Sequence, residues 1–347
     1  MANSVIGLDI GTTRVRAVEV QRGRGAPTVQ RYGEVPLPLG AVRDGEVVAP
    51  EVVVPALKQL WSQGKFSQRE VVIGVGNQRV MVRNLSLPWM PMAHLRASLP
   101  FQVQDILPVP VEDALLDYYP TEESNGPDGR QVHGLLVAAT RDTVQANLAA
   151  AESAGLRPTV VDLNAFALFR AHLVSGIADR VVALIDIGAA STNVIVAAHG
   201  VPRLVRTLPT GGQYVSDAVA AAMNVAVVEA DDIKRQVGVG FAVPRELEAA
   251  ADVINHVSQS MVESIRNTLV YYASNHPGEP IEMAILTGGG AYLNGLGQYI
   301  SSATRLPVAM ADLVASVSVA RSAPLGRFPG VESAIAVPLG LAMAVAA

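Results

Sequence analysis

Two short turns in the sequence carry residue types that can bind a phosphate group. They read DIGTT at residues 9–13 and DIGAAS at residues 186–191, and each ends an apolar run. Glycine lets backbone N–H groups approach an anion, and nearby hydroxyls can donate to phosphate oxygens. Two facing aspartates can hold Mg²⁺, usually through its waters. The residues expected to bind the phosphates and their cation are Asp9, Gly11, Thr12, Thr13, Arg14, Asp186, Gly188, Ala190 and Ser191, with the Thr192 hydroxyl as a further donor. Among them, Asp9 and Asp186 are the expected metal ligands.

A third turn, GGG at residues 288–290, also follows an apolar run. Any one of these turns is typical of an ordinary β-turn capped by a polar side chain. Their order is a stronger signal, because the two D-I-G turns lie half a chain length apart and the triple glycine follows them. The sequence has no Walker A pattern and no G-x-G-x-x-G after a strand, which argues against a P-loop or Rossmann site.

The turns need strands to hold them, and apolar runs alternate with helical spacing along the chain. This alternation predicts an α/β fold. Pro100 is expected to kink or split a helix that Pro108 ends, and TEESNGPDGR at residues 121–130 is expected to be a polar hairpin loop. Strands are predicted over residues 4–10, 15–20, 28–35, 71–75, 80–85, 132–139, 159–162, 182–188, 194–198 and 281–287, and helices over 51–63, 93–107, 142–154, 163–174, 215–222, 227–235, 247–251, 253–273, 293–304 and 338–346.

The second half of the chain repeats the opening. Residues 5–11 read VIGLDIG and residues 182–188 read VALIDIG, and a second apolar strand follows each segment. A repeat at this spacing predicts two related halves, which fits the roughly two domains expected of 347 residues.

Composition excludes several classes of protein. Half of the residues are hydrophobic and only 16% are charged, so the chain can bury a large core. A net charge of −5 argues against a nucleic-acid binder, and the absence of cysteine excludes a disulfide framework or a Cys nucleophile. Asp186 and Asn193 interrupt the apolar stretch 181–201, and 334–347 is too short to span a bilayer. No signal peptide is recognised, so we expect a soluble, cytoplasmic protein.

The ordered D-I-G, D-I-G and G-G-G turns resemble those of the actin, heat-shock-70 and sugar-kinase superfamily. The resemblance implies two duplicated α/β domains around a cleft that holds ATP and Mg²⁺. The D-I-G turns would be the two phosphate loops, and Gly288, Gly289 and Gly290 would form the adenosine loop.

Two further segments could reach the same nucleotide. FtsA-like members of the superfamily often have Glu three residues before a lysine that contacts ribose and base, and here Asp231 precedes Lys234. The alternative for this pair is a solvated ion pair on a helix. Gly211 and Gly212 could approach the phosphates or could only turn the chain before the next helix.

A longer segment narrows the resemblance. Residues 83–119 read RNLSLPWMPMAHLRASLPFQVQDILPVPVEDALLDYY and closely resemble the family of type IV pilus assembly proteins PilM, an FtsA-like family. The likeness continues through residues 136–139, 154–156, 263–266, 286–293 and 340–342. It implies a first actin-like core (1A, residues 1–83 and 158–180), an inserted FtsA-like SHS2 subdomain (1C, 84–157), a second core (2A, 181–226 and 281–347) and a helical subdomain (2B, 227–280).

The same resemblance implies a function. The family is expected to be a cytoplasmic ATP-binding scaffold of the pilus inner-membrane complex, with slow or absent hydrolysis. It would grip the N-terminal cytoplasmic tail of a single-span PilN-like protein, and so lie at the inner membrane through that partner and meet other pilus or motor ATPases. The tail is expected between the first core and the insertion. Leu87, Trp89, Met90 and Leu107 are candidate groove residues, although they could instead pack within the insertion.

Two other functions of the superfamily stay open at this point. A small-molecule kinase would need a base beside an acceptor hydroxyl, for which Asp105 and Asp162 are unassigned acids. An actin-like ATPase would need a residue that orients water, with Gln78 or Glu19 as the available choices.

Overall fold

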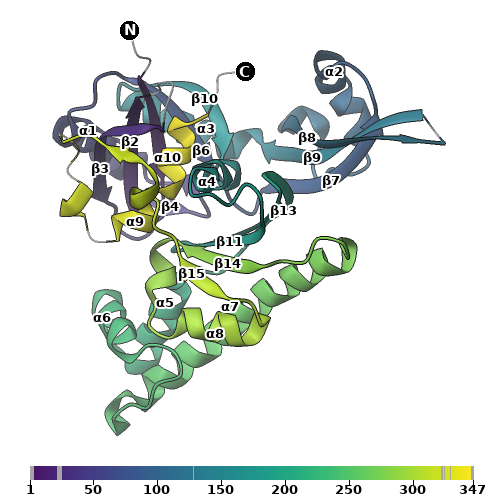
Figure 1. Cartoon of the computed structure of the whole chain (residues 1–347). Coiled ribbons are helices and arrows are strands. Elements are labelled where there is room, and N and C mark those ends of the chain that lie inside the picture. The colour runs from purple at the N-terminus through teal and green to yellow at the C-terminus, as the bar shows by residue number, and fades with distance from the viewer. Residues whose placement is uncertain are drawn as a thin grey trace.

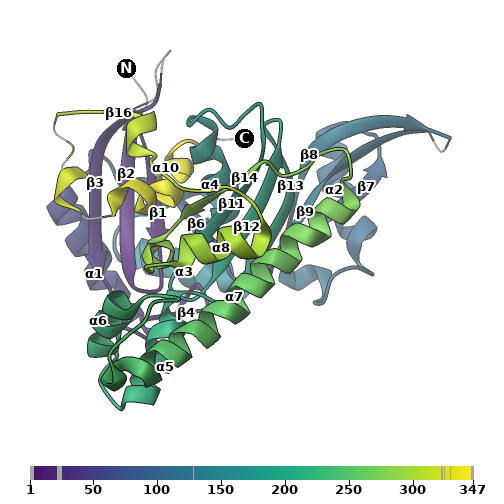
Figure 2. The ribbon, with the colours of Figure 1, turned by 60° about the horizontal axis from the view of Figure 1, so that its bottom comes forward.

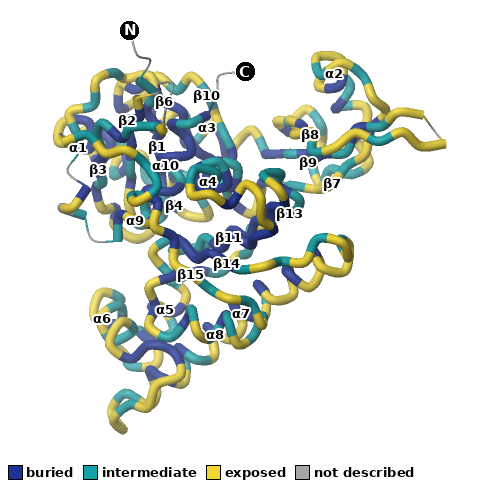
Figure 3. Tube along the Cα trace, viewed as in Figure 1, coloured by how far each residue is buried: buried dark blue, intermediate teal, exposed yellow. Residues whose placement is uncertain are grey.

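The computed structural model describes residues 4–21, 26–127, 129–321, 323, 325–328 and 330–344. In this part of the chain, two mixed β-sheets form the body of the molecule and a smaller sheet projects from one side (Figure 1). Strands and helices alternate as the sequence predicts, and the centres of the two larger sheets are buried (Figure 3).

The first sheet has the strand order β10-β6-β1-β2-β3-β16. The helix α1 covers it. The helix begins with Pro50, in the first turn, where a backbone N–H would have no partner within the helix. It ends before Lys65, whose backbone has the left-handed conformation. Leu57, Leu60 and Trp61 of this helix are buried in the core under the sheet. The elements are β1 (Ser4–Ile10), β2 (Arg14–Gln21), β3 (Thr28–Pro36), α1 (Pro50–Gly64), β6 (Glu70–Val75), β10 (Arg157–Leu163) and β16 (Ser318–Val319).

The second sheet repeats the first. Its order is β13-β12-β11-β14-β15, which matches β3-β2-β1-β6-β10 strand for strand. When the sheets are followed from β3 to β10 and from β13 to β15, the first two pairings are antiparallel and the last two are parallel. The predicted duplication is therefore confirmed. The strands are β11 (Val181–Ile187), β12 (Thr192–Ala198), β13 (Val201–Leu208), β14 (Met283–Thr287) and β15 (Val308–Met310).

The helices α5 to α8 pack on the second sheet or extend from it, and α4 (Asn164–Leu173) also contacts β12 of this sheet. The longest, α7, is continuous where the sequence predicts two helices, because its apolar stripe of Ile254, Met261, Ile265 and Leu269 is buried along its length. It contacts α5, α6 and α8. The bounds are α5 (Gly212–Met223), α6 (Val227–Val237), α7 (Glu248–Asn275) and α8 (Leu296–Thr304).

The projecting sheet has the order β7-β9-β8, with α2 on one face. Here two local predictions are wrong. The polar segment 121–130 is mostly strand, since β8 runs to Gly126 and β9 begins at Gly129, and backbone hydrogen bonds do not require apolar side chains on an exposed hairpin. Pro100 lies inside α2 and does not split the helix. The helix ends at Val103, so Pro108 is not the residue that ends it. The bounds are β7 (Val80–Pro88), α2 (Met92–Val103), β8 (Ala114–Gly126) and β9 (Gly129–Thr140).

After the projecting sheet the chain returns to the first core. The helix α3 (Arg141–Ser153) contacts α1, β10 and β5, and its residues Ala150 and Ala151 are buried beneath the first sheet. The strand β5 (Glu46–Val47) forms a short hairpin with β4 (Val42–Arg43). The helix α4 (Asn164–Leu173) then leads to the second sheet.

The C-terminal segment crosses back to the first half. Figure 2 shows β16 beside β3 and α10 on the first sheet. The approach is close, since a Cβ on Gly340 would lie 1.8 Å from the carbonyl oxygen of Ala167 on α4, and one on Gly7 would lie 2.1 Å from that of Pro338. The closing helix, predicted over residues 338–346, begins two residues earlier, and 345–346 lie outside the described residues. The bounds are α9 (Val331–Ala334) and α10 (Ala336–Ala342).

Within the described ranges, no helix has both the length and the apolar character needed to cross a lipid bilayer.

Candidate functional site

A cavity of about 760 Å³ lies between the two larger sheets. This volume is within the range of small-molecule sites, about 300–1,000 Å³. The three glycine turns and the residues Asp231 and Lys234 of α6 all contribute to its wall. The predicted residues that line it are Asp9, Gly11, Thr12, Thr13, Arg14, Asp186, Gly188, Ala190, Ser191, Gly212, Asp231, Lys234, Gly288, Gly289 and Gly290.

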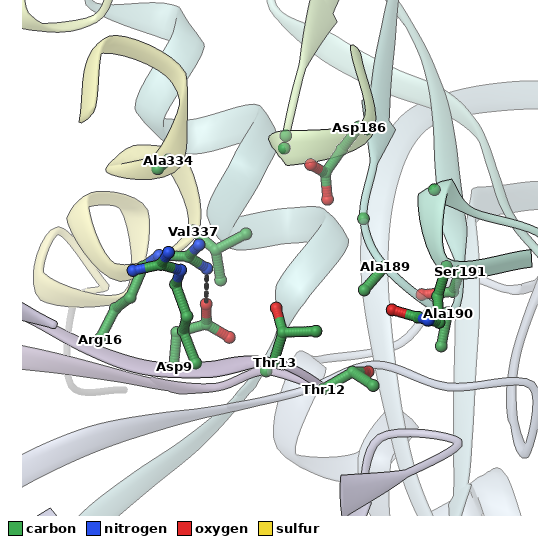
Figure 4. A pocket seen from close by; sticks show the side chains of 18 of the residues that line it. Asp9, Thr12, Thr13, Arg16, Asp186, Ala189, Ala190, Ser191, Ala334 and Val337 are labelled. Atoms are coloured by element: carbon green, nitrogen blue, oxygen red, sulfur yellow. Dashed lines mark ion pairs between the residues drawn. The ribbon is translucent and has the colours of Figure 1, made fainter. Parts of the chain in front are cut away.

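The two D-I-G turns have the same local geometry. The N–H of Gly11 donates to the carbonyl of Arg14 at 2.9 Å, and the N–H of Gly188 donates to the carbonyl of Ser191 at 2.9 Å. Each turn joins the central strand of its sheet to the next strand. Figure 4 shows Thr12 and Thr13 from one turn and Ala190 and Ser191 from the other on two sides of the cavity.

In the first sheet, the aspartate of the turn is paired with a cation. Asp9 lies opposite Arg16 in the β1–β2 register, and an Arg16 Nη1 lies 3.6 Å from Asp9 Oδ2 (Figure 4). Arg16 Nε also donates to Glu34 at 3.3 Å, and Glu34 accepts from Arg14 at 2.6 Å. Burial raises the pKa of Asp9, and the positive charge of Arg16 opposes that rise.

In the second sheet, neutral groups occupy the equivalent positions. Asn193 lies opposite Asp186 in the β11–β12 register and donates to its Oδ2 at 3.3 Å. Thr207 on β13 donates to Asn193 at 2.9 Å. Burial raises the pKa of Asp186 to about 6, because the hydrogen bond from Asn193 offsets only part of the desolvation and the charge of Asp9 adds to the rise. The two hairpins therefore have the same backbone geometry. The aspartate of the first has a charged partner, and the aspartate of the second has a neutral one.

The Asp186 and Asp9 side chains extend into the cavity from opposite hairpins (Figure 4). Oxygen ligands of this kind suit Mg²⁺, which usually keeps several waters and takes its other ligands from substrate phosphates. No cluster of three or more His, Asp or Glu side chains that could hold a metal occurs in the described residues. The donor set therefore fits a hydrated cation shared with a ligand, and does not fit a closed protein cage.

Asp231 and Lys234 form one corner of the cavity. Lys234 Nζ donates to Asp231 Oδ1 at 2.5 Å, to Ser216 Oγ at 2.8 Å and to the Gly212 carbonyl at 3.2 Å. Partial burial works against the charge of Asp231, but the hydrogen bond and charge of Lys234 lower its pKa overall. Asp231 and Lys234 therefore form an ion pair that is also part of the cavity wall.

The glycines of the third turn are required for different reasons. Gly288 has φ +84°, and a Cβ there would lie 2.5 Å from Asp186 Oδ1. A Cβ on Gly290 would lie 2.5 Å from Ile187, whereas one on Gly289 would meet no atom within 4 Å. Gly288 and Gly290 therefore let this turn pack against the second D-I-G turn. Gly289 faces the open space of the cavity.

Two predicted contacts of the second half lie behind the wall. Gly211 does not line the cavity, and a Cβ there would lie 2.4 Å from the Ala189 carbonyl, so this glycine supports the turn from behind. The Thr192 hydroxyl is fully buried and donates to the Thr210 carbonyl at 2.8 Å. The expectation that Thr192 donates into the site is wrong, because its side chain points to the opposite face of the strand from Asn193.

The four groove candidates fall into two environments. Leu87 is 4% exposed in the core between α2 and the projecting sheet, and Met90 and Leu107 pack against that core. Trp89 is 41% exposed, with the Arg130 guanidinium 4.2 Å above its ring. Among the four candidates, Trp89 is therefore the one with an exposed side chain, and the other three pack within the insertion.

The remaining acids and amides are also placed. Gln78 lines the cavity. Asp162 pairs with Arg170 at 2.9 Å, and Glu19 is buried where it accepts hydrogen bonds from Ser4, Ser67 and Arg31; neither acid lines the cavity, nor does Asp105.

Several cavity residues do not follow from the sequence patterns used above. Arg16 is the one that is easiest to predict from the sequence. Side chains alternate between the two faces of a strand, and residue 16 pairs with residue 9 across a four-residue turn. Glu34 follows from the same reasoning one strand further along. The side chain of Asn164 reaches the wall from the start of α4, and its Oδ1 is buried without a hydrogen-bond partner. The other unpredicted lining residues include Asp44, Gly45, Gly76, Asn77, Tyr292, Gly330 and Ser333.

Comparison with known proteins agrees with this architecture. The family described as "Type IV pilus assembly protein PilM" matches residues 7–346. A chain of the solved PilM-PilN type IV pilus biogenesis complex superposes with a TM-score of 0.84 and 27% identity, over 99% of this chain and 98% of that one.

More distant relatives share the fold. MreB5 of Spiroplasma citri bound to AMPPNP gives a TM-score of 0.56 and 14% identity over 99% of this chain and 96% of that one. The cell division protein FtsA of Bacillus subtilis (strain 168) is 23% identical over 67% of this chain, which spans 58% of the length of that relative.

Proposed function

The chain belongs to the type IV pilus assembly protein PilM family, and from this premise we propose that it is a cytoplasmic ATP-binding scaffold of the pilus inner-membrane complex. It binds the N-terminal cytoplasmic tail of a PilN-like single-span protein and is peripheral at the inner membrane through that partner. Other pilus inner-membrane or motor ATPase proteins would dock on the same scaffold. The observation that carries the nucleotide part is the convergence of two equivalent D-I-G turns and a triple-glycine turn on one cavity.

The nucleotide would lie across both halves. Backbone groups and hydroxyls of residues 11–14 and 188–191 would contact its phosphates, with Gly211 and Gly212 supporting the second turn. Gly288, Gly289 and Gly290 would face the adenosine, and Asp231 and Lys234 the ribose and base. Bound Mg²⁺ would neutralise phosphate charge, with Asp9 and Asp186 as its protein ligands, usually through water.

We propose that hydrolysis is slow or absent. Asp9 is engaged by Arg16, and Asp186 would be committed to the cation. Asn164 and Gln78, which also reach the cavity wall, carry amides that cannot accept a proton from water, so Gln78 would orient a water without activating it as a base. The kinase alternative has less support, because Asp162 is held by Arg170 and neither it nor Asp105 lines the cavity.

The solved relative that contains both PilM and PilN supports the peptide-binding part. The tail would lie where the projecting sheet meets the first core. We propose the same four domain limits for the folded chain, except that the contacts of α3 with α1 and β10 favour assigning that helix to the first core.

Nucleotide binding can be tested with two substitutions in the wall. Asp9→Ala removes a metal ligand, and Gly289→Val fills the cavity without meeting the protein. Both are expected to abolish binding of a fluorescent ATP analogue while the far-UV circular dichroism spectrum is retained. Gly278→Val is the matched control, because a Cβ there also meets no atom within 4 Å but Gly278 does not line the cavity. Unchanged titrations in both cavity variants would reject the site.

The peptide-binding role needs a separate test. The N-terminal peptide of a PilN-like protein should bind with a Kd on the order of micromolar or tighter, about −8 kcal/mol, in calorimetry. Absence of heat both with and without ATP–Mg²⁺ would reject the scaffold role. Several turnovers per second of a phosphorylated small molecule would favour a kinase instead.

A further inference from the structure

A partly buried polar cluster lies at the base of the projecting sheet. Its centre is the Glu46 carboxylate, on β5 of the short hairpin. Three donors converge on it: Thr143 Oγ1 at 2.5 Å, Arg79 Nη1 at 3.1 Å and Asn77 Nδ2 at 3.4 Å. Thr143 and Asn77 are 0% and 2% exposed, so their hydrogen bonds are shielded from solvent, whereas the Arg79 side chain is 57% exposed and closes the cluster at the surface.

The donors come from the two connections between the first core and the projecting sheet. Asn77 and Arg79 lie between β6 and β7, where the chain leaves the first sheet. Thr143 lies on the first turn of α3, directly after β9, where the chain returns. These connections meet at the base of the sheet, since Val80 of β7 pairs with Ala139 of β9. Glu46 therefore holds both ends of the insertion at one point.

The same hairpin forms part of the cavity wall. Asp44 and Gly45 have φ +50° and +76°, which makes the tight two-residue turn that suits a hairpin. Both residues line the cavity, as do Gly76, Asn77 and Gln78. A Cβ on Gly45 would lie 3.0 Å from the Gly76 carbonyl oxygen and from Asn77 Cβ, so the turn and the outgoing connection are in close contact.

A second buried residue fixes the hairpin to α3. Asn147 is 1% exposed, accepts from the Val47 N–H at 3.0 Å and donates to the Gly45 carbonyl at 2.9 Å. The backbone on both sides of Glu46 is thus bonded to α3, one helical turn after Thr143. Displacement of the cavity wall at residues 44–45 must therefore move α3 or break buried hydrogen bonds, which is costly.

We infer that Glu46 is a positioning residue that couples the cavity to the projecting sheet, so that a nucleotide in the cavity sets the orientation of β7, β8 and β9 relative to the first core. This inference rests on the proposed nucleotide site. The nucleotide acts only through contacts that differ between two orientations, and residues 44–45 and 76–78 are where such contacts are made. By linkage, a peptide bound against the sheet changes nucleotide affinity by the same factor.

Spin-label distances test this coupling, and the absence of cysteine allows a clean labelling background. Lys58→Cys on α1 and Gln102→Cys on α2 are both exposed sites, one on the first core and one on the insertion. ATP–Mg²⁺ is expected to shift the distance distribution between the two labels. Glu46→Ala removes the acceptor of all three donors, and it is expected to abolish this shift while the protein still binds the fluorescent ATP analogue.

Two further variants make the result decisive. Glu152→Gln removes a charge from the exposed face of the same α3 and should keep the full shift. Thr143→Val removes one donor to Glu46 with little change of shape, and should lose the shift even if Glu46→Ala does not fold. A shift retained in Thr143→Val or Glu46→Ala overturns the inference. No shift in the parent with ATP bound overturns it too, while leaving the proposed nucleotide site intact; failure of the parent to bind ATP overturns both.

Discussion

At the scale of single residues, the site is defined by two aspartates in equivalent positions with different neighbours. Arg16 faces Asp9 at 3.6 Å, whereas Asn193 faces Asp186 at 3.3 Å. Burial raises the pKa of both carboxylates, but only Asp9 has a positive charge beside it. The first half is therefore balanced before any ligand enters, and the second half is not.

This difference predicts a pH dependence of stability. The pKa of Asp186 is about 6 in the folded protein against 3.8 in the unfolded chain, so folding favours its protonated form. The stabilisation is complete below about pH 4 and is lost as the pH rises through about 6. Asp186→Asn removes the ionisation. It should raise the free energy of unfolding relative to wild type at about pH 8 by up to about 3 kcal/mol, and by little at about pH 4.

Urea unfolding of both proteins without nucleotide, followed by circular dichroism at the two pH values, measures this difference. A gap between variant and wild type that is the same at both pH values would contradict the shifted pKa.

At the scale of elements, the crossing of α4 and α10 depends on one glycine. A Cβ on Gly340 would lie 1.8 Å from the Ala167 carbonyl oxygen, and backbone on both sides prevents easy relief. Gly340→Ala should therefore lower the free energy of unfolding by about 3 kcal/mol or more. Gly297→Ala on α8 is the control, because its Cβ would meet only Leu286 and Val308 side chains at 3.8 and 3.9 Å. There the change should be neutral or stabilise by less than about 1 kcal/mol.

Thermal unfolding of the two alanine variants decides this prediction. Equal melting temperatures for both would show that the helices can separate to admit a methyl group.

Most elements could be predicted from the sequence, because long apolar runs and helical spacing dominate where a core must be covered. The duplicated strands and the glycine turns followed from the repeated D-I-G pattern. Short edge strands such as β15 and β16 gave no signal, since two or three residues carry no periodicity and their pairing depends on distant partners. The hairpin segment 121–130 was mistaken for a loop, because its polar side chains reflect exposure and not the absence of pairing.

The site could be predicted at the turns and not beyond them. Glycines in the sequence identify the turn residues, whereas Arg16 can be assigned to the site only when its strand register is known. Asn77, Asn164 and Ser333 reach the cavity from segments far apart in the chain. Their positions depend on tertiary structure that no local pattern encodes.

At the scale of the whole molecule, the parts share a core. Val80, Leu135 and Ala139 of the projecting sheet belong to the same buried cluster as Leu168 of α4 and Leu184 of the second sheet. The C-terminal segment adds a second link, because it leaves the second sheet and covers the first. Because these buried contacts join all three sheets, we expect the sheets to unfold together.

The two tryptophans report on this cooperativity. Trp61 is buried in the first core and Trp89 lies on the projecting sheet. In Trp61→Phe and in Trp89→Phe the single remaining tryptophan follows one part, and its urea midpoint should coincide with that of far-UV circular dichroism in the same variant. A Trp89 transition at clearly lower urea would show that the insertion unfolds alone.

The projecting sheet is also a lever. Its strand β9 has 12 residues, which at about 3.3 Å per residue gives an arm of about 40 Å from the Glu46 cluster to the hairpin tip. A rotation of about 5° at the base would displace the tip by about 3 Å, the length of a hydrogen bond. Adjustments too small to open the cavity would thus be large enough, at the tip, to make or break a contact with another protein.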